Sequence, residues 1–137
     1  MRISSRGRYG LRAMIYLAGH EGAHPVPLSE IAAREGISPA FLERIAAQLR
    51  GAGLVSATRG AAGGYRLARR ANQISVADVV VALEGPLDLL DCVHGSRACE
   101  RSEGCPSRRA LTRLDEAVEA ALAGVTLNDL VTEEMSQ

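Results

Sequence analysis

The feature that most constrains the fold is the stretch 31–50, which has the pattern of two helices joined by a tight turn. Gly36 can adopt the positive φ that a sharp turn needs, Ser38 is a good N-cap, and Pro39 suits a first helical position. Apolar side chains then recur at three- and four-residue steps and share one face of the second helix: Leu42, Ile45 and Leu49. The pattern predicts a helix-turn-helix, although an αα-hairpin in an ordinary helical core would share these signals.

On the opposite face of this second helix, the side chains are short near the cap and polar further along. An α-helix fits the major groove of B-DNA, where base edges offer hydrogen bonds. We therefore interpret it as a recognition helix, and the candidate DNA contacts in and around it are Ser38, Ala40, Phe41, Glu43, Arg44 and Arg50.

Charge is divided unevenly along the chain. The formal net charge of the 137 residues is zero, but residues 1–72 contain 11 Arg and 4 Glu, whereas residues 73–137 contain 5 Arg and 12 acidic residues. An arginine-rich half can neutralise phosphates while an acidic half stays away from DNA. The zero net charge therefore does not argue against a nucleic-acid partner.

A first helix is predicted over residues 4–19, with a cap at Ser4 or Ser5. Arginines and hydroxyls near a helix N-terminus are typical phosphate contacts, although a solvated basic face would have the same composition. The candidate phosphate contacts in this segment are Arg2, Ser5, Arg6 and Tyr9.

Residues 54–68 contain two short β-prone runs around a Gly-rich tip, which is the pattern of a β-ribbon. Arg59 and Arg66 flank the tip, and an arginine on a ribbon can enter a narrow minor groove. A helix, a recognition helix and a ribbon in this order predict a winged helix that binds double-stranded DNA.

A long helix is predicted from Pro106 to about Ala123. Its apolar residues follow heptad-like steps opposite a charged face: Leu111, Leu114, Val118, Ala121 and Leu122. Such a stripe needs a partner, and paired DNA half-sites call for two-fold symmetry, so we expect a homodimer through this helix. Packing against the chain's own winged helix is the alternative.

All three cysteines, Cys92, Cys99 and Cys105, lie within 14 residues among Gly, Ser, Glu and Arg. Without a signal peptide or a membrane-spanning run, the chain is expected in the cytoplasm, where structural disulfides are disfavoured. Clustered thiolates suit an iron–sulfur cluster or zinc, and the spacing C-x6-C-x5-C is longer than the knuckles usual for zinc. Cys105 also precedes a helix start, where the helix dipole favours the thiolate. The pattern favours a cluster, with zinc and redox-active thiols as alternatives.

Three parts of the sequence carry a resemblance to a known family: the opening run Met1–Tyr9, the run from Gly51 to Tyr65 with its Arg59-Gly60 and Gly63-Gly64 pairs, and the three-cysteine loop. Together they resemble the IscR/NsrR/RirA family of iron–sulfur-cluster-sensing winged-helix transcription regulators, over nearly the whole chain. The resemblance implies a homodimer crossed through the long helix, a cluster near the dimer interface and a pseudo-palindromic operator. It also implies that Glu43 and Arg59 contribute to base discrimination, and that phosphates lie near Arg2, Ser5, Arg6 and Tyr9.

The chain departs from the family at the fourth cluster ligand. IscR-like members place a histidine three residues after the last cysteine, where this chain has Arg108. NsrR-like members use a carboxylate of the first helix, but no acidic residue precedes Glu21 here. The fourth ligand is therefore unassigned, and the candidates are Asp91, His94, Glu100, Glu103 or a small molecule. Three thiolates and one labile position favour a 4Fe–4S cluster over a 2Fe–2S cluster.

The predicted fold class is mainly α with a small β-hairpin. Residues 1–84 would form a winged helix-turn-helix DNA-binding domain, and residues 85–137 a cysteine-rich cluster-binding loop and a dimerisation helix. We expect a transcriptional regulator, acting as a repressor, whose operator affinity is controlled by a cluster that senses iron, redox state or nitric oxide. A cluster-free regulator with a thiol–disulfide switch or zinc on the loop is the alternative. No catalytic triad order, phosphate-binding loop or dinucleotide fingerprint indicates an enzyme.

Overall fold

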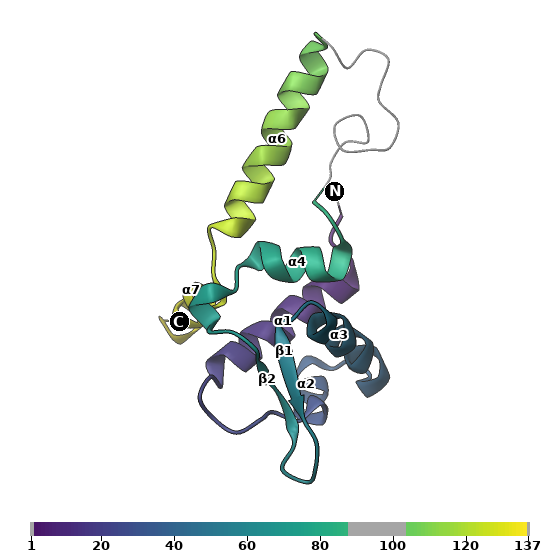
Figure 1. Cartoon of the computed structure of the whole chain (residues 1–137), viewed down its shortest axis with the longest axis vertical. Helices are drawn as coiled ribbons and strands as arrows, with labels where there is room; N and C mark the ends of the chain where they lie inside the picture. Colours follow the sequence, from purple (N-terminus) through teal and green to yellow (C-terminus); the bar gives the residue numbers. More distant parts are fainter. Residues whose placement is uncertain (1, 88–103, 137) are drawn as a thin grey trace.

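The computed structural model describes residues 2–87 and 104–136, which form a compact head and one long helix that projects from it (Figure 1). The described elements are α1 (Ser5–Gly19), α2 (Leu28–Glu35), α3 (Pro39–Gly51), β1 (Val55–Thr58), β2 (Gly64–Leu67), η1 (Ala71–Gln73), α4 (Val76–Glu84), α6 (Pro106–Ala123) and α7 (Leu127–Ser136). The predicted fold class, mainly α with a small β-hairpin in a winged helix-turn-helix, is confirmed.

The helix-turn-helix consists of α2 and α3, and it forms as its local signals predict. Gly36 ends α2 with φ +67°, and the Ser38 hydroxyl accepts a 3.1 Å hydrogen bond from the backbone N–H of Phe41. Pro39 occupies the first turn of α3. The apolar stripe of α3 is buried against the rest of the head, with exposed fractions of 1%, 0% and 2% for Leu42, Ile45 and Leu49.

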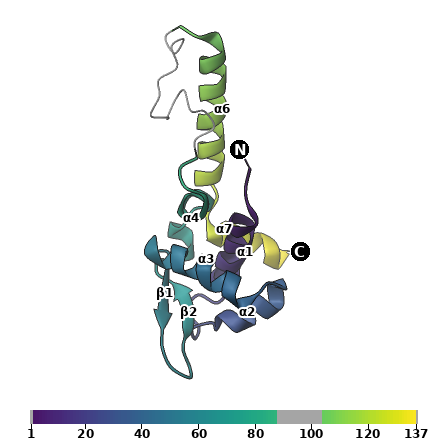
Figure 2. The same cartoon turned by 90° about the vertical axis from the view of Figure 1, so that its right-hand side faces the viewer.

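The wing is an antiparallel pair in which Val55 lies opposite Leu67 and Thr58 lies opposite Gly64. Val26, in the loop between α1 and α2, bridges to Tyr65 through two backbone hydrogen bonds of 2.8 Å. The base of the wing is therefore held by the loop on one side and by α3 on the other, while the tip extends away from the head (Figure 2).

The core of the head draws on nearly every described element except α6. Five core side chains have an exposed fraction of 0%, and they come from α1, α3, the extended segment before α4, α4 and α7. They are Met14, Ile45, Ile74, Val79 and Leu127. The last helix, α7, thus returns to the head, where the backbone N–H of Leu127 donates to the carbonyl of Ile74 at 2.9 Å. The boundary predicted at residue 84 is not tested by this arrangement, but the head includes residues on both sides of it.

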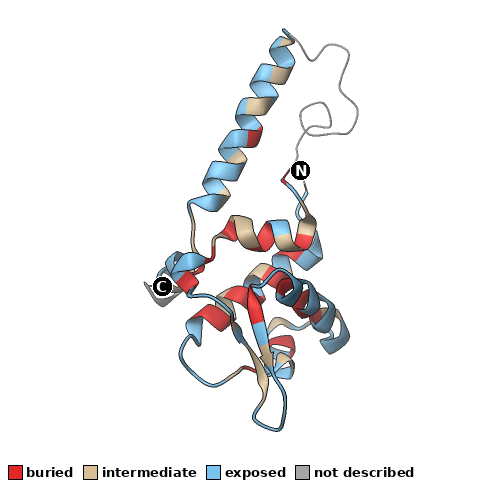
Figure 3. Ribbon diagram, viewed as in Figure 1, coloured by how far each residue is buried: buried red, intermediate tan, exposed pale blue. Residues whose placement is uncertain are grey.

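The long helix α6 begins at Pro106 and ends at Ala123, as predicted, and it is mostly exposed (Figure 3). Its foot contacts α4 through a small apolar cluster that contains Val80 and Leu122. Further along, Leu111 and Leu114 are 39% and 52% exposed. None of the helices within residues 2–87 and 104–136 has the length and hydrophobicity of a membrane span.

Candidate nucleic-acid interface and cysteine segment

The N-terminal ends of α1 and α3 meet at an aromatic contact. The rings of Tyr9 and Phe41 are perpendicular, with centroids 6.2 Å apart, and both side chains are half-buried against the core. Ser5 and Arg6 are exposed in the first turn of α1. The structure therefore brings one predicted phosphate contact of α1, Tyr9, against the first turn of the predicted recognition helix, with Ser5 and Arg6 one turn earlier on α1.

The exposed face of α3 carries the other candidates. Ala40, Glu43 and Arg44 are exposed on its first two turns, and Ser38 is exposed at its cap. Arg50 is exposed in the last turn, roughly 15 Å along the axis from Ala40 at 1.5 Å per residue. A helix with a fully buried back and this exposed front can enter a major groove.

A polar network joins α1 to α2 beside this surface. Arg12 Nε lies 2.7 Å from Glu35 Oε2, and the Arg12 guanidinium also lies over the Tyr9 ring, 5.8 Å from its centroid. Tyr16 donates a 2.7 Å hydrogen bond to Glu30, which raises the pKa of the Tyr16 phenol. Arg12 is thus engaged in holding the two helices together, a role that the sequence pattern did not reveal.

A second contact missed by sequence reasoning joins the start of α1 to the end of α4. Glu84 Oε1 accepts hydrogen bonds from the backbone N–H of Ser4 at 2.9 Å and from the Ser4 hydroxyl at 2.5 Å. The Ser4 hydroxyl bond lowers the pKa of the Glu84 carboxyl most, with smaller lowering from the Ser4 backbone and Arg6 against a raising effect of burial. The two residues are 80 positions apart, so no local pattern could indicate the contact.

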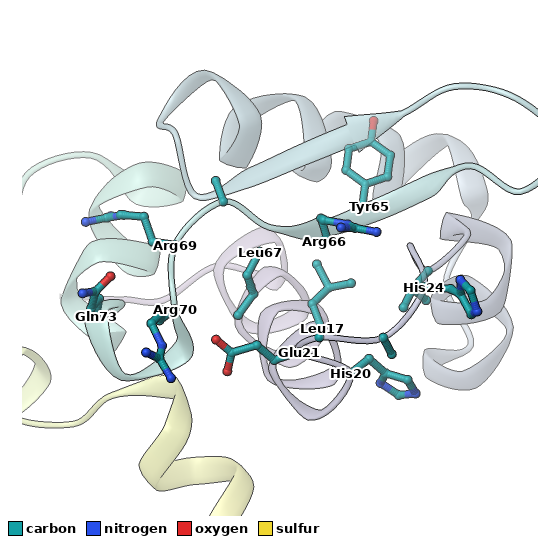
Figure 4. Close-up of a pocket in the computed structure, with 14 residues that line it drawn as sticks. Leu17, His20, Glu21, His24, Tyr65, Arg66, Leu67, Arg69, Arg70 and Gln73 are labelled. Atoms are coloured by element: carbon teal, nitrogen blue, oxygen red, sulfur yellow. The ribbon is translucent and has the colours of Figure 1, made fainter.

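The two wing arginines have different surroundings. Arg59 is exposed in the turn that follows β1, whereas Arg66, in β2, lines a cavity of about 410 Å³ at the base of the wing (Figure 4). In this cavity Arg66 lies at the end near His24, and Arg69 and Arg70 lie at the other end. Three arginines and one carboxylate, Glu21, line this depression, so its formal charge is positive, which suits phosphate.

Of the three cysteines, the structure describes only Cys105, because Cys92 and Cys99 lie outside the described residues, as do Asp91, His94, Glu100 and Glu103. Cys105 is the N-cap residue of α6, and its thiol is partly exposed and not in a disulfide. Within residues 2–87 and 104–136 no group of three His, Cys, Asp or Glu could hold a metal ion. The described residues therefore do not test the predicted metal ligands.

The chain is similar to proteins of one family along almost its whole length. Residues 3–133 match the Rrf2 family, described as "Iron-dependent Transcriptional regulator". The HTH-type transcriptional regulator IscR of Xenorhabdus nematophila is 39% identical over 131 residues, which are 96% of this chain and 79% of that protein. IscR of Photobacterium profundum is also 39% identical over 131 residues, 96% of this chain and 76% of its own.

Solved structures give the same result. CymR (YrzC), the global cysteine regulator of B. subtilis, superposes with a TM-score of 0.83 at 37% identity, covering 97% of this chain and 98% of its own. IscR of T. potens superposes with a TM-score of 0.79 at 36% identity, covering 98% and 88%. These relatives are regulators, which confirms the prediction that the chain is not an enzyme. The chain belongs to the Rrf2 family of transcriptional regulators.

Proposed function

We propose that this regulator binds a pseudo-palindromic operator as a homodimer and that an iron–sulfur cluster on Cys92, Cys99 and Cys105 sets its operator affinity. The observation that carries the proposal is the position of the cysteine run. It ends at the N-cap of α6, the helix that leads from the cysteines back to the DNA-binding head. A change in the cysteine run can therefore reach the head through a rigid element.

DNA contact is supported by the juxtaposition of α1 and α3. In this proposal Glu43 and Arg44 face base edges in the major groove, and Arg59 enters the flanking minor groove. The remaining candidates contact the backbone, which positions the protein but does not read sequence. They are Arg2, Ser5, Arg6, Tyr9, Ser38, Ala40, Phe41, Arg50 and Arg66.

A homodimer through α6 is supported by its exposed apolar stripe. Leu111 and Leu114 would be enclosed if the same helix of a second subunit packed against them, as in a two-stranded bundle. The two α3 helices must then lie about one DNA turn apart, roughly 34 Å, to enter both half-sites. A small change in the angle between α6 and the head would alter that spacing.

The residues fit an iron–sulfur cluster by the chemistry of their donor atoms. Thiolates are the usual cluster ligands, and the Cys105 thiol is partly exposed at the positive end of an 18-residue helix. When bound, a cluster would supply a centre that iron loss, oxidation or nitric oxide can alter. We favour a 4Fe–4S over a 2Fe–2S cluster because the chain offers three thiolates and no fourth ligand at the position of Arg108.

The second candidate is a regulator that senses through its thiols or through zinc, without a cluster. It is favoured by one finding, the similarity to CymR, which is described as a global cysteine regulator. In this case Cys92, Cys99 and Cys105 would form a thiol–disulfide switch or a zinc site on the same loop.

The test is operator binding by anaerobically purified protein, measured by fluorescence anisotropy before and after cluster removal with a chelator or nitric oxide. A salt titration against random DNA should show steep salt dependence for both duplexes and a specificity ratio for the operator. A tenfold difference between cluster-loaded and stripped protein needs only about 1.4 kcal/mol. Colourless protein whose DNA affinity responds to thiol oxidants, and not to chelators, would favour the second candidate.

A further inference from the structure

The contact between Ser4 and Glu84 links the first turn of α1, which carries candidate phosphate contacts, to the end of α4, from which the chain continues toward the cysteines. Ser4 is the N-cap of α1, and its hydroxyl accepts from the backbone N–H of Gly7 at 3.4 Å while it donates to Glu84. Ser5 and Arg6, the candidate phosphate contacts, follow immediately. The position of the first turn of α1 is therefore set by a carboxylate of another helix.

Glu84 is the last residue of α4, and the chain leaves α4 toward the cysteine run, which begins eight residues later at Cys92. On the way, Leu87 is buried in the cluster that also contains Val80 and contacts Leu11 of α1 and Leu122 of α6. The end of α4 is thus anchored both to α1 and to the foot of α6.

Gly7 allows this approach. A Cβ atom at position 7 would collide with the Glu84 carboxylate and would also lie 2.9 Å from Ile3 Cγ2. The absence of a side chain at Gly7 lets Glu84 reach over the first turn of α1 to Ser4. Alanine is the better helix former at such a position, so a helix-propensity argument alone would favour it.

We propose that Glu84 is a positioning residue for DNA binding, which holds the N-terminal turn of α1 in place and ties it to the segment that leads into the cysteines. The sensing part of this proposal rests on the proposed function, whereas the positioning part needs only that the protein binds an operator. Because Glu84 contributes no DNA contact, it acts through Ser4.

The negative charge of Glu84 lets the experiment separate an electrostatic effect from a positioning effect, because the two change operator affinity in opposite directions. Removing a carboxylate from a DNA-binding head should by itself strengthen attraction to phosphates. Loss of positioning has the opposite effect on the operator, whose contacts require one geometry, and little effect on random DNA, whose phosphates can be met in many registers. Glu84→Ala should therefore weaken operator binding about five- to tenfold, or roughly 1 to 1.4 kcal/mol, and should not weaken binding to random DNA.

The experiment compares the full-length wild type with Glu84→Ala, Gly7→Ala, Ser4→Ala and the double variant Ser4→Ala/Glu84→Ala, with Glu116→Ala on α6 as the charge-matched control. Affinities for operator and random duplexes are measured on cluster-loaded and chelator-stripped protein, and thermal unfolding checks that each variant is folded. Gly7→Ala leaves both hydrogen-bonding side chains in the chain but displaces the Glu84 carboxylate, together with the Ile3 side chain. It is therefore used if Glu84→Ala does not fold.

The expected result is a selective loss of operator affinity in Glu84→Ala and Gly7→Ala, with the double variant no weaker than Ser4→Ala. The ratio of operator affinities between cluster-loaded and chelator-stripped protein should also shrink toward one in Glu84→Ala and Gly7→Ala. Operator affinity equal to or above that of the wild type, as in the control, would overturn the proposal, and so would additive losses in the double variant. If the wild type shows no difference between loaded and stripped protein, the cluster proposal fails, while the operator affinities still decide whether Glu84 is a positioning residue.

Discussion

The helices α3 and α6 have similar apolar spacing but opposite surroundings. In α3 the stripe is enclosed by the chain's own head, whereas in α6 Leu111 and Leu114 are 39% and 52% exposed. An amphipathic pattern thus shows which face of a helix needs cover, but not which molecule provides it. The head thus encloses its own core, whereas we propose that the apolar face of α6 is covered by a second subunit.

The largest effect is expected from breaking the α6 stripe with Leu111→Glu and Leu114→Glu together. If α6 is the dimer interface, the variant should be monomeric and lose the avidity of two half-sites, about 1,000-fold in operator affinity. Sedimentation and anisotropy measure the two consequences. The monomeric head should remain folded, because neither side chain belongs to its core. A variant that remains dimeric would contradict the proposed interface.

The corresponding substitution in the buried stripe of α3 is Ile45→Ala. Ile45 is fully buried, so the truncation should lower the free energy of unfolding by about 3 kcal/mol through lost burial and a residual cavity. Denaturant unfolding measures it, with Leu114→Ala as the matched control on the exposed stripe. If both variants lose the same free energy of unfolding while the dimer stays intact, the stripes of α3 and α6 are not buried differently and the proposed contrast is wrong.

The next effect separates the two kinds of DNA contact. Arg59→Ala should cost about 1–3 kcal/mol of operator affinity and relax sequence preference, because an arginine in the minor groove reads its width. Arg6→Ala should weaken operator and random DNA alike and reduce the salt slope by about 1. Salt-titrated anisotropy on operator and random duplexes distinguishes the two variants. If Arg59→Ala weakens binding to both duplexes equally, Arg59 contacts phosphate and does not read sequence.

The smallest effect concerns pH. The Ser4 hydrogen bonds lower the pKa of the Glu84 carboxyl, so the folded head favours its ionised form. That stabilisation is fully present above the pKa of the unfolded chain and is lost as the pH falls through the lower, folded value. Compared with the wild type, Glu84→Gln should therefore show a flatter decline of the thermal midpoint below about pH 5. Parallel curves for the two proteins would show that the carboxylate is not stabilised in the fold.

Much of the fold could be predicted because it is encoded by residues close in sequence. The turn at Gly36, the cap at Ser38 and the bounds of α6 depend on neighbours within four residues or on a simple period. The hairpin pairs two strands that are separated only by the turn 59–63. The capping box at Ser75 and Asp78 belongs to the same class, with hydrogen bonds of 2.9 and 3.1 Å.

The missed features are contacts between distant residues. Arg12 follows no pattern that predicts a partner, but it pairs with Glu35 of another helix. Glu84 carried no signal at all, since a carboxylate at a helix end is usually solvated and its partner lies 80 residues away. The cavity beside the wing joins the Arg69-Arg70 pair to residues of β2 and to those of the loop after α1, which lie more than 40 positions earlier in the chain, so no local pattern predicts it.

Native mass spectrometry of the full-length protein, purified without oxygen, reports both the oligomeric state and the bound cofactor. We expect a species of twice the 14.5 kDa chain mass plus one iron–sulfur cluster per chain. Variants with serine at Cys92, Cys99 or Cys105 should keep the dimer and lose the added mass. A chain that carries only zinc, or no added mass under these conditions, would contradict cluster sensing, and a monomer would contradict the role assigned to α6.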